Sequence, residues 1–158
     1  MKKIFLIIIS VITAAFGGAA AMDVKRVRDV ESKRQLSEKH LRMFKMMNRW
    51  VQIKQDDRSV ADYFKRNGYK KIIVYGVHYI GKTLIEELKN TDIEIVCGID
   101  KNDYVLSEKI TLINKTDKIP DTDIIVVTAI AEFDKIEDEL KQFVNFPIVS
   151  LEDILYAL

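Results

Sequence analysis

Short runs of β-branched residues alternate with segments of helical periodicity over residues 59–158. Five apolar runs are expected to be strands: residues 72–75, 93–99, 110–113, 124–128 and 148–149. The apolar spacing of helices is found at residues 80–88 and 133–144. Strands that lack polar alternation are buried on both faces, which is typical of parallel sheets covered by helices. The pattern therefore predicts an α/β, doubly wound, mostly parallel five-stranded sheet in the order 3-2-1-4-5.

Capping residues mark the helix boundaries of this domain. Ser59 can cap a short helix that ends at Asn67-Gly68, where glycine accepts a left-handed conformation. Ser150 and Asp153 have the spacing of a capping box for a closing helix. We therefore expect residues 59–158 to form one domain.

The charge of the chain is divided between its two ends. Residues 1–58 contain 13 Lys or Arg and 6 Asp or Glu, whereas residues 59–158 contain 12 and 18. A basic N-terminal part thus precedes an acidic domain, and no nucleic-acid partner is predicted. The single cysteine, Cys97, excludes an internal disulfide and is interpreted as a core residue. With only two distant histidines beside it, no metal site is predicted.

The N-terminal segment has the character of a membrane anchor. Residues 4–21 carry no charge, and as a helix they would be about 27 Å long, close to the thickness of a hydrocarbon core. We expect a single-pass helix or a shallower insertion into lipid. A cleaved signal peptide is the alternative, because two lysines precede the segment and residues 19–21 resemble a cleavage site. Because more basic residues follow than precede the segment, the positive-inside rule predicts a cytoplasmic soluble domain at the cell membrane.

Residues 22–58 form a basic arm that contains no Pro or Gly and is expected to be helical. An apolar stripe recurs along it at helical spacing: Leu41, Phe44, Met47, and Trp50 or Val51. The stripe could pack on its own domain, on lipid, on a membrane enzyme or on a second copy in a homodimer. Arg34 and Ser37 interrupt the upstream seam that a dimeric coil would need.

The first strand runs into a turn bracketed by glycines, and this turn is the expected binding site. Gly76 to Thr83 matches the P-loop pattern G-x-x-x-x-G-K-[ST], in which Lys82 and Thr83 would contact phosphate and magnesium. Gly76 and Gly81 also occupy the first and third positions of a dinucleotide-type G-x-G-x-x-G turn, with His78 at the middle position. Either turn favours an anion at the N-terminus of the following helix.

Several residues favour the dinucleotide-type interpretation of this turn. Its interior residues are too bulky for a phosphate-wrapping nest, and Asp100 ends the second strand where a ribose hydroxyl would lie. A strand-end carboxylate there is expected to be solvated when no ligand is bound. A third interpretation is that both glycines serve only packing. The predicted cofactor-binding residues are Gly76, Val77, His78, Tyr79, Gly81, Lys82, Asp100 and Thr128.

A family resemblance rests on five segments of this domain. They are Ala-Asp-Tyr-Phe at 61–64, Gly-Tyr-Lys-Lys-Ile-Ile-Val-Tyr-Gly at 68–76, Gly-Ile-Asp-Lys-Asn at 98–102, Asp-Ile-Ile-Val-Val-Thr at 123–128 and Pro-Ile-Val-Ser-Leu-Glu-Asp-Ile-Leu at 147–155. The domain resembles small Rossmann-like modules of bacterial surface-polysaccharide biosynthesis clusters, and is similar to the nucleotide-sugar-binding N-terminal domain of bacterial sugar acetyltransferases. The resemblance implies a sugar-nucleotide near Gly76, His78, Gly81 and Asp100. The acetyltransferase half has no counterpart here.

No catalytic constellation accompanies the binding-type turn. No Tyr is followed by a Lys four residues later, so the reductase pair is missing, and no second domain is present to hold a substrate. We therefore predict a membrane-tethered, cytoplasmic accessory or sensing module that binds a nucleotide, a sugar-nucleotide or NAD. The alternatives are a degenerate P-loop nucleotidase that uses Lys82 and Thr83, and an interaction domain without a ligand.

Overall fold

The computed structural model describes residues 2–101, 110–114 and 117–158, with side chains described from residue 25 onward. It contains two compact units, of which the first ends at Arg42 and the second spans Met43–Leu158. Helix α1 (Lys2–Gln55) runs from the first unit into the second. Among the helices searched, which are those with described side chains, none is long and apolar enough to cross a membrane. The expected membrane segment, residues 4–21, lies outside the residues whose side chains the structure describes.

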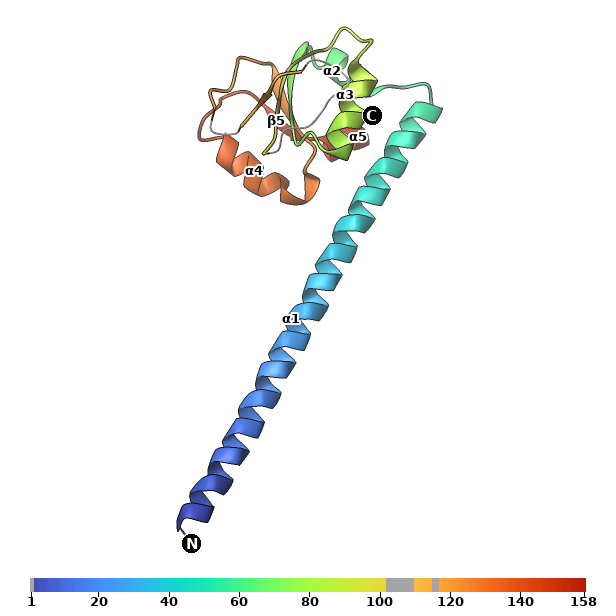
Figure 1. Ribbon diagram of the computed structural model, residues 1–158. Coiled ribbons are helices and arrows are strands. Elements are labelled where there is room, and N and C mark those ends of the chain that lie inside the picture. Colours follow the sequence, from blue (N-terminus) through green and yellow to red (C-terminus); the bar gives the residue numbers. More distant parts are fainter. Residues whose placement is uncertain (1, 102–109, 115–116) are drawn as a thin grey trace. The chain divides into compact units, whose positions relative to one another are not determined.

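The sheet has the predicted composition and strand order. It contains β1 (Lys71–Tyr75), β2 (Glu94–Ile99), β3 (Leu112–Ile113), β4 (Ile124–Val127) and β5 (Ile148–Ser150). All neighbouring pairs are parallel and the order is β3-β2-β1-β4-β5, which confirms the doubly wound α/β prediction (Figure 1). The third strand is shorter than expected, because it pairs with β2 at only two positions.

The helices cover the two faces of the sheet unequally. One face packs against α2 (Val60–Arg66), α3 (Tyr79–Leu88), α5 (Leu151–Ala157) and the last turns of α1. On the other face, the buried cluster contains residues of α4 (Phe133–Leu140) and of no other described helix (Figure 1). The described part of the connection from β3 to β4 contains no helix. This second face is therefore the thinly covered one.

Helix α4 is shorter than the predicted helix over residues 133–144. A 3₁₀ turn, η1 (Ile130–Glu132), precedes it, and α4 itself ends at Leu140. The Leu140 carbonyl accepts hydrogen bonds from the N–H groups of Phe143 and Val144, at 2.9 and 3.1 Å. This sharing tightens the last turn and ends the helix. As a result Phe143 leaves the helical face and is 74% exposed.

The apolar stripe of the basic arm has a different docking face from the one expected. Met46, Trp50 and Ile53 are buried in the core of the second unit. Leu41, Phe44 and Val51 are instead 52%, 70% and 52% exposed. The predicted stripe therefore combines two faces of the helix: Trp50 is buried and Met47 is partly buried against the same core, whereas Leu41, Phe44 and Val51 face solvent. Helix α1 does dock on its own domain, on a face centred on Met46, Trp50 and Ile53.

Glu87 fixes the docked end of α1 against the domain. Its carboxylate accepts hydrogen bonds from Trp50 Nε1 at 2.5 Å, Ser59 Oγ at 3.0 Å and the Val60 N–H at 2.9 Å. Lys54 Nζ lies 3.3 Å away. One half-buried carboxylate on α3 therefore ties together the end of α1 and the start of α2.

The predicted caps are confirmed. Ser59 and Asp62 form a reciprocal capping box at α2, and Gly68 ends that helix with φ +73°. The Ser150 hydroxyl accepts from the Asp153 N–H at the start of α5. These local signals account for the boundaries that the sequence predicted most closely.

Candidate functional site

The glycine turn between β1 and α3 is a close backbone contact. Gly76 has φ +89°, and a Cβ atom there would lie 2.7 Å from Thr128 Oγ1. A Cβ atom on Gly81 would lie 2.1 Å from the Gly76 carbonyl oxygen. The Thr128 hydroxyl donates to that same carbonyl and so covers the turn from β4. Both glycines are thus explained by packing, whatever the turn binds.

The turn is shorter than a phosphate-wrapping loop. Helix α3 begins at Tyr79, so Gly81, Lys82 and Thr83 lie within its first turns. The Thr83 hydroxyl donates to the Tyr79 carbonyl of the same helix at 3.1 Å. A nest of successive N–H groups needs a loop over residues 77–80, of which Tyr79 and Ile80 are already helical. This geometry favours the dinucleotide-type turn over the P-loop.

Asp100 is a structural partner of the turn as well as a candidate ligand group. Its Oδ2 accepts from the Val77 N–H and its Oδ1 from the Lys101 N–H, both at 2.7 Å. Val77 is fully buried, so its N–H depends on this carboxylate. The expectation that the carboxylate is merely solvated without a ligand is therefore wrong, because sequence spacing does not show a contact between two turns.

A crevice lies at the carboxyl ends of β1 to β4, where the strand order reverses. We call it the switch-point crevice; its volume is about 360 Å³. Its lining residues are Tyr75, Gly76, Ile99, Asp100, Lys101, Asn114, Ala129, Glu132, Lys135, Ile136 and Glu139. Open parallel sheets bind ligands at this location.

The predicted site residues are divided between this crevice and its surroundings. Only Gly76 and Asp100 line it. The other six are Val77, which is buried behind the turn, Thr128, which is buried at the end of β4, Gly81 and Lys82 in α3, and the exposed His78 and Tyr79. The rings of His78 and Tyr79 contact each other edge to face, with centroids 3.9 Å apart.

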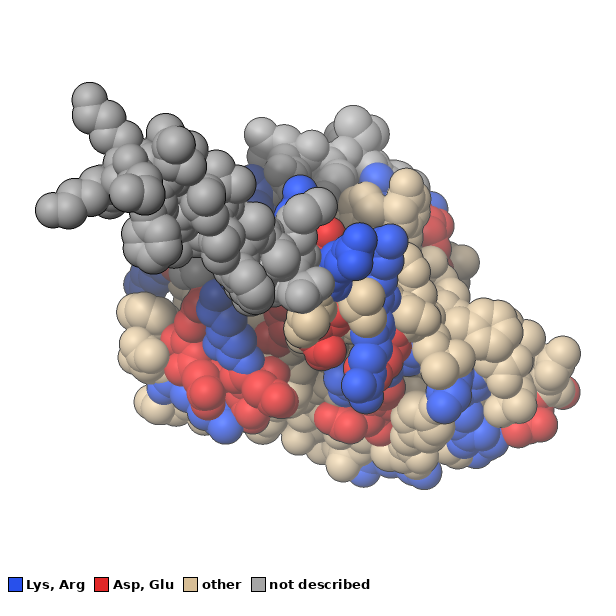
Figure 2. Space-filling view, turned by 90° about the horizontal axis from the view of Figure 1, so that it is seen from below, with Lys and Arg blue, Asp and Glu red and all other residues tan. Residues whose placement is uncertain are grey.

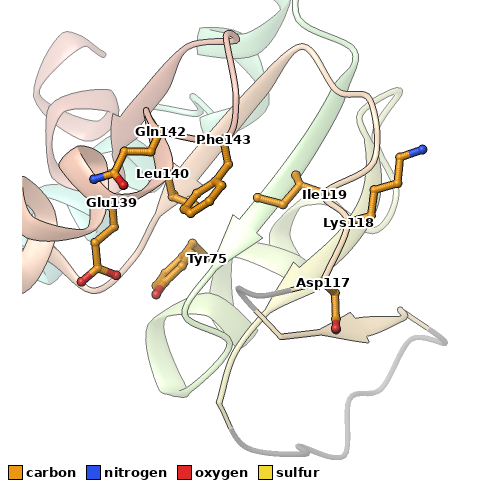
Figure 3. Close-up of a pocket in the computed structure, with 8 residues that line it drawn as sticks. All are labelled: Tyr75, Asp117, Lys118, Ile119, Glu139, Leu140, Gln142 and Phe143. Carbon is orange, nitrogen blue, oxygen red and sulfur yellow. The ribbon is translucent and has the colours of Figure 1, made fainter.

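A second cavity adjoins the crevice on the thinly covered face of the sheet. This aromatic pocket has a volume of about 650 Å³ and is lined by Tyr75, Asp117, Lys118, Ile119, Glu139, Leu140, Gln142 and Phe143. Tyr75 and Glu139 line both cavities. In Figure 3 the Tyr75 ring comes from the end of β1, whereas Phe143 comes from the segment after α4.

Sequence reasoning missed the aromatic pocket for two reasons. It placed Phe143 within a longer helix, residues 133–144, although this side chain is exposed and lines the pocket. It also had no pattern for the β3–β4 connection, which supplies Ile119. The available signal was the absence of helical periodicity between residues 114 and 123, which predicts a gap in the cover of one face.

The charges around the crevice are mixed. Lys101 and Lys135 face a lining that also holds Asp100, Glu132 and Glu139. On the face seen in Figure 2, Lys and Arg side chains are interspersed with Asp and Glu among the coloured residues. No cluster of three or more His, Cys, Asp or Glu suited to a metal occurs among the described residues. Such a lining can bind a polar, hydroxyl-rich ligand and offers two cations to a phosphate.

Cys97 is a core residue, as predicted. It is 2% exposed in β2, and burial raises the pKa of its thiol to about 11. Such a thiol is a poor nucleophile at neutral pH.

Comparisons with protein-family models, with curated proteins and with solved structures gave no match.

Proposed function

We propose that this chain is a binding module for a nucleotide or sugar-nucleotide, with an accessory or sensing role. The observation that carries the proposal is the pairing of a polar crevice at the switch point with an adjoining aromatic pocket. A nucleotide has the same division, with a flat apolar base at one end and hydroxyl and phosphate groups at the other. The volumes of the two cavities fall in the range of about 300 to 1,000 Å³ that is typical of small-molecule sites.

The base is assigned to the aromatic pocket. Tyr75 and Phe143 supply aromatic surface, and Ile119 and Leu140 supply aliphatic surface. Nucleobases stack on aromatic side chains with little dependence on their identity, at roughly 1 to 3 kcal/mol per base. Glu139 and Gln142 line the same pocket and can hydrogen-bond to a base edge.

The ribose is assigned to Asp100. The Asp100 carboxylate lines the crevice and already accepts hydrogen bonds from the Val77 and Lys101 N–H groups. A ribose diol offers two O–H donors, which a carboxylate at this position can accept as charge-assisted hydrogen bonds. Lys101 and Lys135 are then the cations nearest to a phosphate in the crevice.

An accessory role fits a binding-type turn that no catalytic constellation accompanies in the sequence. The described residues that line the two cavities offer carboxylates, lysines and a tyrosine, which suit the binding of hydroxyl and phosphate groups. Membrane attachment through residues 4–21, a cytoplasmic location and a link to surface-polysaccharide synthesis are parts of the proposal that rest on the sequence.

Calorimetry with UDP-sugars, NAD and ATP with magnesium tests the assignment. Phe143→Ala and Asp100→Asn should each weaken binding of the preferred ligand by about tenfold or more. Asp138→Ala is the matched control, because Asp138 is exposed on α4 and lines neither cavity. The proposal fails if wild type binds none of these ligands. Magnesium-dependent ATP binding that Lys82→Ala abolishes would favour the P-loop nucleotidase instead.

A further inference from the structure

We infer that α1 forms a parallel, in-register coiled coil with α1 of a second copy of this chain. The inference begins with the exposed apolar residues of the helix. Val27 and Val30 are 70% and 66% exposed, and Leu41, Phe44 and Val51 are all at least half exposed. Isolated exposed residues need no explanation, but a set with one regular spacing does.

These residues share one heptad register along α1. With Val27 at position a, Val30 falls at d, Leu41 at a, and Phe44 and Val51 at d. The remaining core positions are Arg34, Ser37 and Asn48. A seam at a and d is the contact surface of a coiled coil, and a polar residue such as asparagine at a fixes register and favours two strands. Asn48 therefore specifies the pairing at a cost in stability, whereas Arg34 and Ser37 weaken the middle of the seam.

Within the second unit, the docked face of α1 leaves its part of this seam, from Phe44 to Val51, exposed. In the second unit, the fully buried Met46 and Ile53 fall at heptad position f and Trp50 falls at c. Positions c and f point away from the partner in a coiled coil, whereas a and d point toward it. In the same unit Phe44 and Val51 are exposed at d. A second copy can therefore bind without displacing the domain from its own helix.

The flanking charges select a parallel partner. In a parallel, in-register pair, each g residue faces the e residue of the partner five positions further along. Arg26 then faces Glu31 of the second copy, and Lys33 faces Glu38. In an antiparallel pair, g would face g and e would face e, which juxtaposes like charges at these positions. This complementarity also favours a second copy over lipid.

Disulfide trapping tests both the partner and its orientation. Full-length chain in mild detergent, in a Cys97→Ala background, would carry Phe44→Cys at d or Leu36→Cys at c. Leu36 is 53% exposed and lies off the seam, so it is the matched control. A disulfide needs Cα atoms within roughly 7 Å, so only Phe44→Cys should cross-link to itself. Equal cross-linking of both variants, or a monomeric mass by sedimentation, overturns the inference.

Charge reversal distinguishes the parallel from the antiparallel pair when each variant is compared with the chain that carries Phe44→Cys alone. Adding Glu31→Lys and Glu38→Lys should reduce cross-linking of the chain to itself several-fold, because g then faces e of the same charge, and an Arg26→Glu, Lys33→Glu chain should restore cross-linking as its partner. Unchanged cross-linking of the Glu31→Lys, Glu38→Lys chain to itself would overturn the parallel arrangement, because an antiparallel pair has like charges at g–g and e–e before and after the substitution. Trp50 fluorescence verifies that each variant keeps its docked helix, since Trp50 is the single tryptophan and is buried.

Discussion

Gly81→Ala should destabilise the domain, although Gly81 lies in a helix where alanine is the better residue. Helix propensity alone predicts a gain of about 0.5 to 1 kcal/mol. The added Cβ, however, would lie 2.1 Å from the Gly76 carbonyl oxygen, where real Cβ atoms essentially never approach within 3.0 Å. The obstacle is backbone and cannot rotate away, so α3 and β1 must separate by roughly 1 Å, and overpacking of this kind costs about 1 to 3 kcal/mol or more. We expect a net loss of about 1 to 2 kcal/mol, which is the packing cost minus the gain in helix propensity.

Urea denaturation followed by Trp50 fluorescence measures this loss, because Trp50 is buried against the domain. Gly68→Ala is the control. Its φ is +73° but nothing lies within 4 Å of the added Cβ, so only backbone strain of about 1 to 2 kcal/mol applies. The observation that would refute the reasoning is a Gly81→Ala variant as stable as wild type, since it would mean that helix and strand are not in contact at this glycine.

Three further predictions concern charges and buried polar groups. Glu87→Ala should cost roughly 1.5 to 3 kcal/mol in the same urea assay, because it leaves the Trp50 and Val60 N–H groups without their acceptor. Burial raises the pKa of the Cys97 thiol to about 11. The stability contributed by the neutral thiol is therefore lost as the pH rises from the unfolded-state pKa toward 11. Cys97→Ala should flatten the decrease of the free energy of unfolding over this alkaline range. Hydrogen bonds from the Lys71 and Lys70 N–H groups lower the pKa of Asp123. The stability that Asp123 contributes is therefore present above its unfolded-state pKa and is lost as the pH falls through its folded-state pKa. Asp123→Asn should flatten the decrease of the free energy of unfolding at acid pH.

The order of the sheet could be predicted because its signals are local. Continuous runs such as Ile124–Val127 are buried on both faces, and the connections between them follow the usual winding. Capping by Ser59 and Ser150 is likewise decided within four residues. The ends of the elements were less predictable where tertiary contacts decide them, as at β3 and at the shortened α4.

The docking face of α1 shows where periodicity alone fails. The helix carries apolar residues on two faces, and a spacing of three and four residues can be followed from one face to the other. Met46 and Ile53 were missed because the spacing was counted from Leu41 and Phe44, which face solvent. Only the position of the domain distinguishes the two faces. When a helix has two apolar faces, its sequence does not show which face packs against the chain's own domain.

The reasons to expect a ligand differ between the sequence and the folded domain. In the sequence, the glycines at 76 and 81 are the main reason to expect a ligand, and packing is the competing explanation. In the structure, packing accounts for both glycines, since each excludes a side chain by contact with its surroundings. The Asp100 carboxylate likewise has a structural role, because it accepts a hydrogen bond from the buried Val77 N–H. The case for a ligand therefore depends on the two adjoining cavities, and above all on Phe143, which is exposed at the pocket and whose side chain is not needed to fill the core. For this reason a loss of binding in Phe143→Ala without a loss of stability is a stronger test of function than any change at the glycines.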